Sequence, residues 1–302
     1  MSNVRRGRFF RSDRLSEASC ECSVAGRNTD PIAPTSLLTR TIDGLTFSFV
    51  NESDFDLVYN EKFKVNQYKF SARTTSPFIL DCGANIGISV LYFKKLYPRA
   101  RIIAFEPNPE TFKLLERNVQ QNKLRDVQLV NAAVGGSDGE MAFYVNDDPT
   151  FWSLSDTGIA NSYAGPAGWK TITVPQVRLS SYLTEPVDYL KLDIEGMEEI
   201  VLREIEERID TITEIRMEFH HHIANKENDL ERVLSLLARH QFKFAFVRDR
   251  KVLSLPQVQF AIQDSEKDLF LVYTHRQQAR VWWQSRVVPQ IVRVQNRIMR
   301  KV

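Results

Sequence analysis

Two apolar segments in the second half of the chain each run into residues that could handle a proton or a cation. The first is followed by Asp193 and Glu195, and the second by Glu218 and His220. Because side chains alternate along a strand, Asp193 and Glu195 are expected on one side of the first segment. A histidine or a carboxylate within hydrogen-bond reach of a hydroxyl can accept its proton. These four residues are therefore our candidate catalytic site, with His220 as the general base.

A divalent cation held by the same carboxylates is a second way to activate a hydroxyl, because it stabilises the alkoxide that forms. Hard oxygen ligands suit Mg²⁺ better than Zn²⁺. The run His220-His221-His222 does not itself predict a metal site, since neighbouring residues on a strand point to opposite faces. A structural interpretation is also open, in which Glu195 begins the next helix and Lys191 pairs with a neighbouring acid. We expect a general base, and keep Mg²⁺ as the alternative.

A glycine-containing turn earlier in the chain could bind a ligand through its backbone. Residues 78–80 are apolar and run into Asp81-Cys82-Gly83-Ala84-Asn85-Ile86-Gly87, after which a helix is predicted. Glycine allows backbone angles that other residues avoid, and the free N–H groups at a helix start favour an anionic group such as a carboxylate. The predicted cofactor-binding residues of this turn are Asp81, Gly83, Asn85 and Gly87.

The residue types in this turn discriminate between two cofactors. A dinucleotide-binding turn has the pattern Gly-x-Gly-x-x-Gly, and here Asn85 and Ile88 occupy two of its glycine positions. The carboxylate of Asp81 would repel a pyrophosphate but would suit an ammonium group. S-adenosylmethionine carries a cationic amino-acid end and a sulfonium. The turn therefore favours this cofactor over NAD.

Two residues after the next apolar segments could recognise the nucleoside part of the cofactor. Glu106 lies about 20 residues beyond the turn, where an acid in α/β nucleotide sites accepts hydrogen bonds from ribose hydroxyls. Asn131 follows the third apolar segment and could hydrogen-bond the adenine edge, with Ala132 and Ala133 leaving room for the ring. A plain strand-to-turn transition is the alternative for Asn131. We add Glu106 and Asn131 to the predicted cofactor-binding residues.

Four blocks of the sequence, in this order, resemble the FkbM-type methyltransferase family. They are Leu80-Asp81-Cys82-Gly83-Ala84-Asn85-Ile86-Gly87, Phe105-Glu106-Pro107, Asn131-Ala132-Ala133-Val134-Gly135 and Leu190-Lys191-Leu192-Asp193-Ile194-Glu195-Gly196. The resemblance extends over residues 78–220, roughly half of the chain. It implies a doubly wound domain of seven strands that binds S-adenosylmethionine and methylates oxygen, typically a sugar or polyketide hydroxyl.

Apolar strand-like segments alternate with helical segments along the middle of the chain. Strands are predicted over 78–80, 101–105, 127–130, 189–192, 214–219, 242–247 and 269–273, and helices over 88–96, 109–122, 198–208 and 227–240. This alternation implies a parallel sheet with helices on both faces. The predicted fold class is therefore α/β, with a doubly wound, mostly parallel, seven-stranded sheet of the Rossmann-like class I methyltransferase type. Residues 141–145 and 171–177 are predicted to form a β excursion from it.

The two ends of the chain differ in composition from this core. Residues 1–36 are rich in Arg and Ser and are expected to be a disordered leader, which leaves 37–275 as the methyltransferase domain. Residues 276–302 carry basic charges and no acid, with apolar residues at helical spacing, and are expected to form a basic amphipathic helical tail. Such a tail could contact an anionic membrane surface or a protein partner. A solvated terminal helix is the alternative.

Composition sets the remaining expectations. The 302-residue chain has a formal net charge of +2, which does not suggest a nucleic-acid binder, and its three cysteines cannot build a disulfide framework. No apolar run reaches the roughly 18 residues needed to span a bilayer. We therefore expect a cytoplasmic protein, and the family resemblance implies an S-adenosylmethionine-dependent O-methyltransferase acting on a hydroxyl of a sugar, polyketide, glycan or other small metabolite. The alternatives are a non-catalytic binding module that keeps the cofactor fold, and an NAD-dependent oxidoreductase.

Overall fold

The computed structural model describes residues 37–146, 169–222, 228–248, 251–253 and 267–276. The predicted leader, residues 1–36, lies outside these ranges. The predicted tail also lies outside them, except that its first residue, Arg276, is the last residue of a strand. Within the described part of the chain, no helix is both long enough and apolar enough to cross a membrane.

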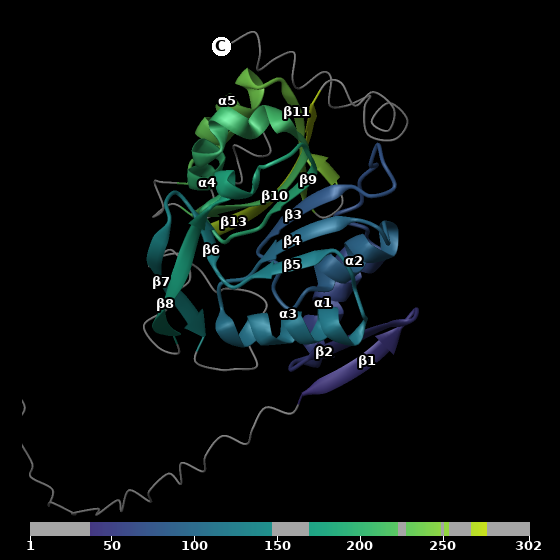
Figure 1. The fold of residues 1–302 in the computed structure, drawn as a ribbon. Helices are drawn as coiled ribbons and strands as arrows, with labels where there is room; N and C mark the ends of the chain where they lie inside the picture. Colours follow the sequence, from purple (N-terminus) through teal and green to yellow (C-terminus); the bar gives the residue numbers. More distant parts are fainter. Residues whose placement is uncertain (1–36, 147–168, 223–227, 249–250, 254–266, 277–302) are drawn as a thin grey trace, which may run out of the picture. The chain divides into compact units, whose positions relative to one another are not determined.

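A large mixed sheet forms the centre of the described domain (Figure 1). Its strands are β3 (Phe78–Cys82), β4 (Arg101–Phe105), β5 (Val127–Val130), β9 (Val187–Leu192), β10 (Ile212–His222), β11 (Phe242–Arg248), β12 (Lys251–Leu253) and β13 (Lys267–Arg276). They are arranged in the order β12-β11-β13-β10-β9-β3-β4-β5. The neighbouring strands from β5 to β10 run parallel, whereas β13 is antiparallel to both β10 and β11. The chain therefore has the predicted α/β architecture.

The predicted number of strands is wrong, because the described sheet has eight strands and not seven. The additional strand is β12, which has three residues and pairs antiparallel with β11 at the edge of the sheet. Three residues are too few to show the period-two alternation from which strands are predicted. Strands β11 and β13, which include the last two predicted strands, pair antiparallel with each other.

Helices cover both faces of this sheet, each over its own hydrophobic core (Figure 1). The covering helices are α2 (Ile88–Leu96), α3 (Pro109–Gln121), α4 (Glu198–Glu204) and α5 (Leu230–Arg239). Leu80 and Leu190 pack with buried residues of α4 and α5. Their sequence neighbours Ile79 and Tyr189 pack instead with buried residues of α2 and α3. Alternate side chains of β3 and β9 thus serve opposite cores, as expected of strands that are buried on both faces.

Two predicted helices are shorter in the structure. Helix α4 ends at Glu204 and is followed by a 3₁₀ turn, η3 (Glu206–Thr211). Helix α5 begins at Leu230 because Asp229 caps it, accepting hydrogen bonds from two backbone N–H groups of the first turn. A side-chain oxygen at this position satisfies N–H groups that have no partner within the helix.

The segment before β3 packs against one side of the domain. It consists of β1 (Leu38–Ile42), β2 (Leu45–Phe49), α1 (Glu52–Tyr59) and a π-helical turn, η1 (Asn60–Lys64). The amide of Asn118 in α3 accepts from the backbone N–H of Ser48 at 2.6 Å and donates to its carbonyl at 3.0 Å. Further along, the guanidinium of Arg216 in β10 donates to the carbonyl of Gln67 at 2.6 Å. These contacts hold the end of the segment beside the central sheet.

The predicted β excursion is a separate three-stranded sheet. Its strands are β6 (Ala133–Gly135), β7 (Gly139–Asn146) and β8 (Trp169–Arg178), in the order β6-β8-β7. Strands β7 and β8 pair antiparallel, and Phe143, Val145 and Val174 form a small buried cluster with Ala133. Phe143 also lines the cavity described below, so this sheet contributes one wall of the site.

Candidate active site

A cavity of about 320 Å³ lies where β3, β4 and β9 end. In doubly wound sheets, ligands bind at the carboxyl ends of the strands, and small-molecule sites occupy a few hundred cubic ångströms or more. Of the predicted site residues, the cavity is lined by Gly83, Asn85, Glu106, Asp193, Glu195, Glu218 and His220. Its lining does not include Asp81, Gly87 or Asn131. The sequence-predicted catalytic residues therefore meet at one place, and the cofactor-binding residues do so in part.

Both glycines of the turn after β3 are required by the backbone and by close packing. Gly83 has a φ of +79°, and a Cβ there would lie 1.8 Å from the carbonyl oxygen of Asp193. Gly87 has a φ of +88°, and its Cβ would lie 2.6 Å from a methyl group of Leu115. Only glycine adopts such angles without strain. The turn is thereby pressed against the segment after β9, which brings the two predicted parts of the site together.

Glu106 braces this turn and also faces the cavity. Its Oε2 accepts a hydrogen bond from the backbone N–H of Asn85 at 2.9 Å, and its Oε1 accepts one from the N–H of Asn108 at 2.9 Å. A carboxylate oxygen can accept more than one hydrogen bond, so these contacts leave capacity for ligand hydroxyls. The predicted role of Glu106 in ribose binding is consistent with its place.

The side chain of Asn131 is hydrogen-bonded to the backbone of the loop that carries Glu106. Its Nδ2 donates to the backbone carbonyls of Glu106 and Pro107, at 2.8 and 3.1 Å. Since the amide nitrogen is used in this way and the residue does not line the cavity, adenine recognition by Asn131 stays a prediction.

Asp81 is buried below the turn and does not face the cavity. Its Oδ2 accepts a hydrogen bond from the hydroxyl of Ser89 at 2.6 Å, and its Oδ1 lies 3.3 Å from the ammonium of Lys191. The sequence suggested an ammonium partner for Asp81, and the structure supplies one from the chain itself. The expected contact between Asp81 and a ligand ammonium is therefore corrected, because the side chain is fully buried and already paired.

Lys191 links the turn to the segment after β9. Its ammonium donates to the carbonyl of Gly83 at 2.6 Å and lies 3.2 Å from Asp193 Oδ2. Burial alone would lower the pKa of Lys191, but Asp193 and Asp81 outweigh this and raise it above its ordinary value. Lys191 is thus a buried cation, and the structural interpretation of this residue, pairing with neighbouring acids, is confirmed.

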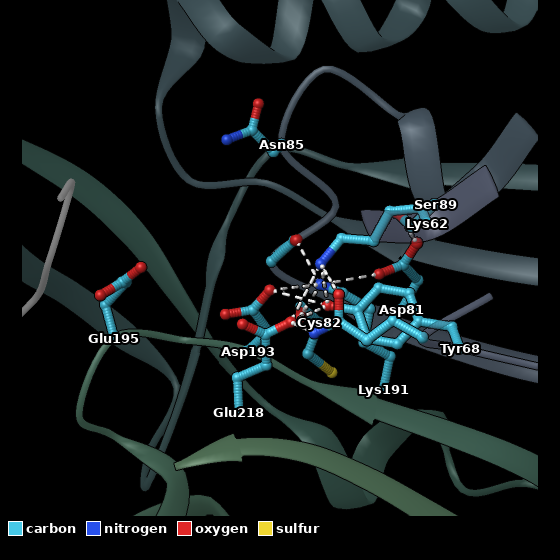
Figure 2. A network of polar contacts seen from close by, with 12 residues as sticks. Lys62, Tyr68, Asp81, Cys82, Asn85, Ser89, Lys191, Asp193, Glu195 and Glu218 are labelled. Atoms are coloured by element: carbon cyan, nitrogen blue, oxygen red, sulfur yellow. Dashed lines mark hydrogen bonds and ion pairs between the residues drawn. The ribbon is translucent and has the colours of Figure 1, made fainter. Parts of the chain in front are cut away.

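A second buried cation, Lys62, reaches the site from the turn η1. Figure 2 shows its ammonium in a dense network with Tyr68, Glu218 and Asp193. It lies 3.0 Å from Glu218 Oε1 and donates to the hydroxyl of Tyr68 at 2.9 Å. The hydroxyl of Tyr68 donates to Glu218 and is 3.1 Å from Asp193 Oδ2. Gln67 also donates to Glu218 Oε1, at 2.7 Å. Glu218 is therefore held by three side chains of the N-terminal segment and is poorly placed to act as a base.

His220 stands between two carboxylates. Its Nδ1 lies 2.9 Å from Glu198 Oε1, and its Nε2 lies 3.3 Å from Glu195 Oε2. Burial lowers the pKa of His220, but Glu195 and Glu198 outweigh it and raise the pKa well above 6.5. Burial raises the pKa of Glu195 to about 8. These two carboxylates lie at both ring nitrogens and favour the protonated form, so the arrangement does not favour His220 as a base, and its role as the general base stays a prediction.

The sequence missed several residues that shape the site. Lys62, Gln67 and Tyr68 come from a stretch without a recognisable motif, more than a hundred residues before the acids they contact. Glu198 is fully buried at the first position of α4, where it also accepts a hydrogen bond from Asn228 at 2.6 Å. Glu198 is the first acid after Glu195-Gly196, which was the available signal for it, but an acid in a first helical turn is ordinary.

Fold and cavity together define a class of protein. A doubly wound α/β domain with a site of this size at the strand ends, a glycine turn and an acid after the second strand is typical of proteins that bind nucleotide-like cofactors. The family model of the methyltransferase FkbM domain matches residues 81–244, which is more than half of the chain. The chain therefore belongs to the FkbM methyltransferase family, and the resemblance seen in the four sequence blocks is confirmed.

Two relatives with similar sequences are themselves methyltransferases. The chain is 29% identical over 192 residues to the methyltransferase sdnD of Sordaria araneosa, which covers 55% of this chain and 74% of that protein. It is 26% identical over 241 residues to the 31-O-demethyl-FK506 methyltransferase FkbM of Streptomyces tacrolimicus, covering 70% of this chain and 90% of that protein. The crystal structure of the methyltransferase FkbM of Methylobacillus flagellatus aligns with 15% identity and a TM-score of 0.46, over 71% of this chain and 47% of that one.

Proposed function

We propose that this protein transfers a methyl group from S-adenosylmethionine to a hydroxyl oxygen of a small metabolite such as a sugar or a polyketide. One observation carries the proposal: the cavity of this methyltransferase-family chain has the glycine turn and Glu106 on one side and Asp193 and Glu195 on the other. Oxygen as the acceptor atom is supported by the name of the Streptomyces tacrolimicus relative, a 31-O-demethyl-FK506 methyltransferase.

The residues of the cavity fit the cofactor. The carboxyl groups of the lining belong to Glu61, Glu106, Asp193, Glu195 and Glu218, and the basic groups to Lys62, Lys191 and His220. Three of these acids, Glu106, Asp193 and Glu195, favour a ligand of positive charge, and S-adenosylmethionine carries a sulfonium and an ammonium. Glu106 would accept hydrogen bonds from its ribose hydroxyls. When bound, the cofactor supplies a methyl group activated by the positively charged sulfur.

The chain's own residues have to hold the acceptor and receive its proton. Glu218 is engaged by three donors and His220 by two carboxylates. Asp193 and Glu195 line the cavity and are each about a fifth exposed at the side chain. A hydroxyl in the cavity can therefore donate its hydrogen bond to one of these two carboxylates, and its proton can leave in that direction. Phe105 and Phe143 add apolar surface to the lining of the cavity.

Calorimetric titration of the full-length protein with S-adenosylhomocysteine and, separately, with NADH tests this function. We expect micromolar binding of S-adenosylhomocysteine and none of NADH. Glu106→Ala should abolish or strongly weaken the binding, and its thermal unfolding shows whether the domain is still folded. Glu61→Gln, which removes another carboxylate of the same cavity, is the matched control and should bind. Binding of NADH alone would point to an oxidoreductase, and no binding by folded protein would reject the methyltransferase proposal.

A methyl-transfer assay separates an enzyme from a binding module. Protein that binds S-adenosylhomocysteine is incubated with methyl-labelled S-adenosylmethionine and a panel of sugars and polyketides, and label in the acceptor is measured. Transfer to a hydroxyl supports the proposal. Transfer to nitrogen or carbon would contradict the proposed acceptor atom.

A further inference from the structure

The carboxylates of Asp193 and Glu195 and the imidazole of His220 converge at one wall of the cavity. One potential ligand atom from each lies within 4.8 Å of those of the other two. Atoms that bind one divalent ion at about 2.1 Å are about 3–4 Å from one another, so small side-chain movements would bring these three to a common ion. Among the described residues, Asp193, Glu195 and His220 form the group of three possible metal ligands with this geometry.

His220 is oriented as metal-binding histidines are. A ligand histidine almost always donates its second ring N–H to a carboxylate, which fixes the ring and its tautomer. Here Nδ1 is 2.9 Å from Oε1 of Glu198, whose side chain is fully buried. Asn228 holds the other oxygen of Glu198 at 2.6 Å and also donates to the carbonyl of His220 at 2.9 Å. The ring is thereby fixed with Nε2 directed toward Glu195 and the cavity.

The charges around this group also favour a cation. Lys191 is shared between Asp81 and Asp193, and Lys62 is paired with Glu218. The charges of the two lysines are therefore already compensated by Asp81, Asp193 and Glu218. Around His220, the acids are Glu195 and Glu198, and Asp193 lies on the other side of the group. When these carboxylates are ionised, they outnumber the one imidazole, and a divalent ion would compensate the excess of negative charge.

We propose that Asp193, Glu195 and His220 bind one divalent metal ion, with Glu198 as the residue that positions His220. Two carboxylates and one imidazole form a mixed oxygen and nitrogen set that suits Mn²⁺ well. Binding would release the proton from Nε2, while Nδ1–H continues to donate to Glu198. Glu218 is not a ligand, because its Oε1 accepts from Lys62, Gln67 and Tyr68.

The role of this ion rests on the proposed function, whereas the site itself does not. A cation beside the cavity would stabilise the alkoxide that forms when an acceptor hydroxyl gives up its proton toward the carboxylate of Asp193 or Glu195. It would thereby supply the activation for which His220, held between two acids, is unsuited. The acceptor class that follows is one with a hydroxyl able to approach the ion, such as a sugar with neighbouring hydroxyls.

Electron paramagnetic resonance with Mn²⁺ tests the site directly. Full-length protein is treated with a chelator and dialysed, Mn²⁺ is titrated in, and the signal of free Mn²⁺ is recorded. We expect one ion bound per chain. Glu195→Gln and His220→Gln should each weaken binding at least about tenfold, and Glu198→Gln by about 10- to 100-fold. Glu61 lines the same cavity but is not one of the three proposed ligands. The variant Glu61→Gln removes the same charge and should bind Mn²⁺ as the wild type does.

The possible results separate the metal site from general attraction and from the proposed function. The proposal is overturned if folded wild-type protein does not reduce the signal of free Mn²⁺. It is also overturned if Glu61→Gln and Glu195→Gln weaken Mn²⁺ binding equally. Should His220→Gln not fold, the isosteric and partly exposed Glu195→Gln still decides. S-adenosylhomocysteine is titrated into the same samples. Mn²⁺ binding without cofactor binding would keep the metal site and reject the methyltransferase proposal, and the reverse result would reject the metal site alone.

Discussion

The two sides of the cavity balance their charges in different ways. On the lysine side, formed by Asp81, Lys191, Lys62 and Glu218, each acid is close to a lysine, at 3.3 Å for Asp81 and 3.0 Å for Glu218. On the histidine side, formed by Glu195, His220 and Glu198, two carboxylates flank one imidazole. Asp193 lies between the two sides, paired with Lys191 and close to His220.

This difference separates residues that hold the site together from residues that meet a ligand. The lysines are almost completely buried and are fixed by backbone carbonyls or neighbouring side chains. Removing one partner of a buried ion pair leaves an uncompensated charge, which is costly. The carboxylates of Asp193 and Glu195 keep about a fifth of their surface open to the cavity. Substitutions on the lysine side should therefore reduce stability, and those on the histidine side should reduce ligand binding.

Lys191→Met should have the largest effect on stability. It leaves the buried carboxylate of Asp81 without its ammonium and removes the hydrogen bond to the carbonyl of Gly83. We expect a loss of about 3–5 kcal/mol in the free energy of unfolding. Urea unfolding followed by circular dichroism measures it.

Arg101→Met is the control for this prediction. Arg101 pairs with Glu185, but both side chains are more than 40% exposed. An exposed pair contributes about 0–1 kcal/mol, so the variant should unfold close to the wild type. A similar loss in both variants would mean that Lys191 is no more important to the fold than a surface residue.

Lys62→Met should have a smaller effect than Lys191→Met. Glu218 loses its cation, but Tyr68 and Gln67 still donate to Glu218 Oε1. Because the acid keeps two hydrogen bonds, we expect a loss of about 1–3 kcal/mol in the same unfolding measurement. A loss equal to that of Lys191→Met would show that Tyr68 and Gln67 do not compensate.

Lys191 and Lys62 also show which contacts can be predicted from the sequence and which cannot. Lys191 lies within a motif, and its pairing with a neighbouring acid could be anticipated from the strand that ends directly before Asp193. Lys62 could not be anticipated, because its contact with Glu218 spans 156 positions and depends on how the N-terminal segment packs on β10. Parallel strands and the glycine turn follow from local pattern, which is why the location of the site could be predicted. The surroundings of His220 include the buried Glu198, which no local pattern indicated, so whether this histidine acts as the base stays a prediction.

Ser89→Ala tests the weakest support of the lysine side. The hydroxyl of Ser89 donates to the buried Asp81 Oδ2 at 2.6 Å. Hydrogen bonds to charged groups contribute about 1.5–3 kcal/mol, and Lys191 continues to compensate Asp81, so we expect a loss near the lower value. Ser89→Thr keeps the hydroxyl and is the matched variant, with unfolding compared in parallel. If Ser89→Ala is as stable as the wild type, the hydrogen bond to Asp81 contributes nothing to the free energy of unfolding.

Glu195→Gln should change stability least, although it lies in the same cavity. Glu198 remains to compensate His220, and the glutamine has the same shape as the glutamate that it replaces. The carboxylate is also a group whose burial raises its pKa to about 8, so a neutral side chain is tolerated there. We expect a change of about 1 kcal/mol or less in the free energy of unfolding, measured in urea beside Lys191→Met. A loss as large as that of Lys191→Met would place Glu195 among the residues that hold the fold, and the division between the two sides of the cavity would then be wrong.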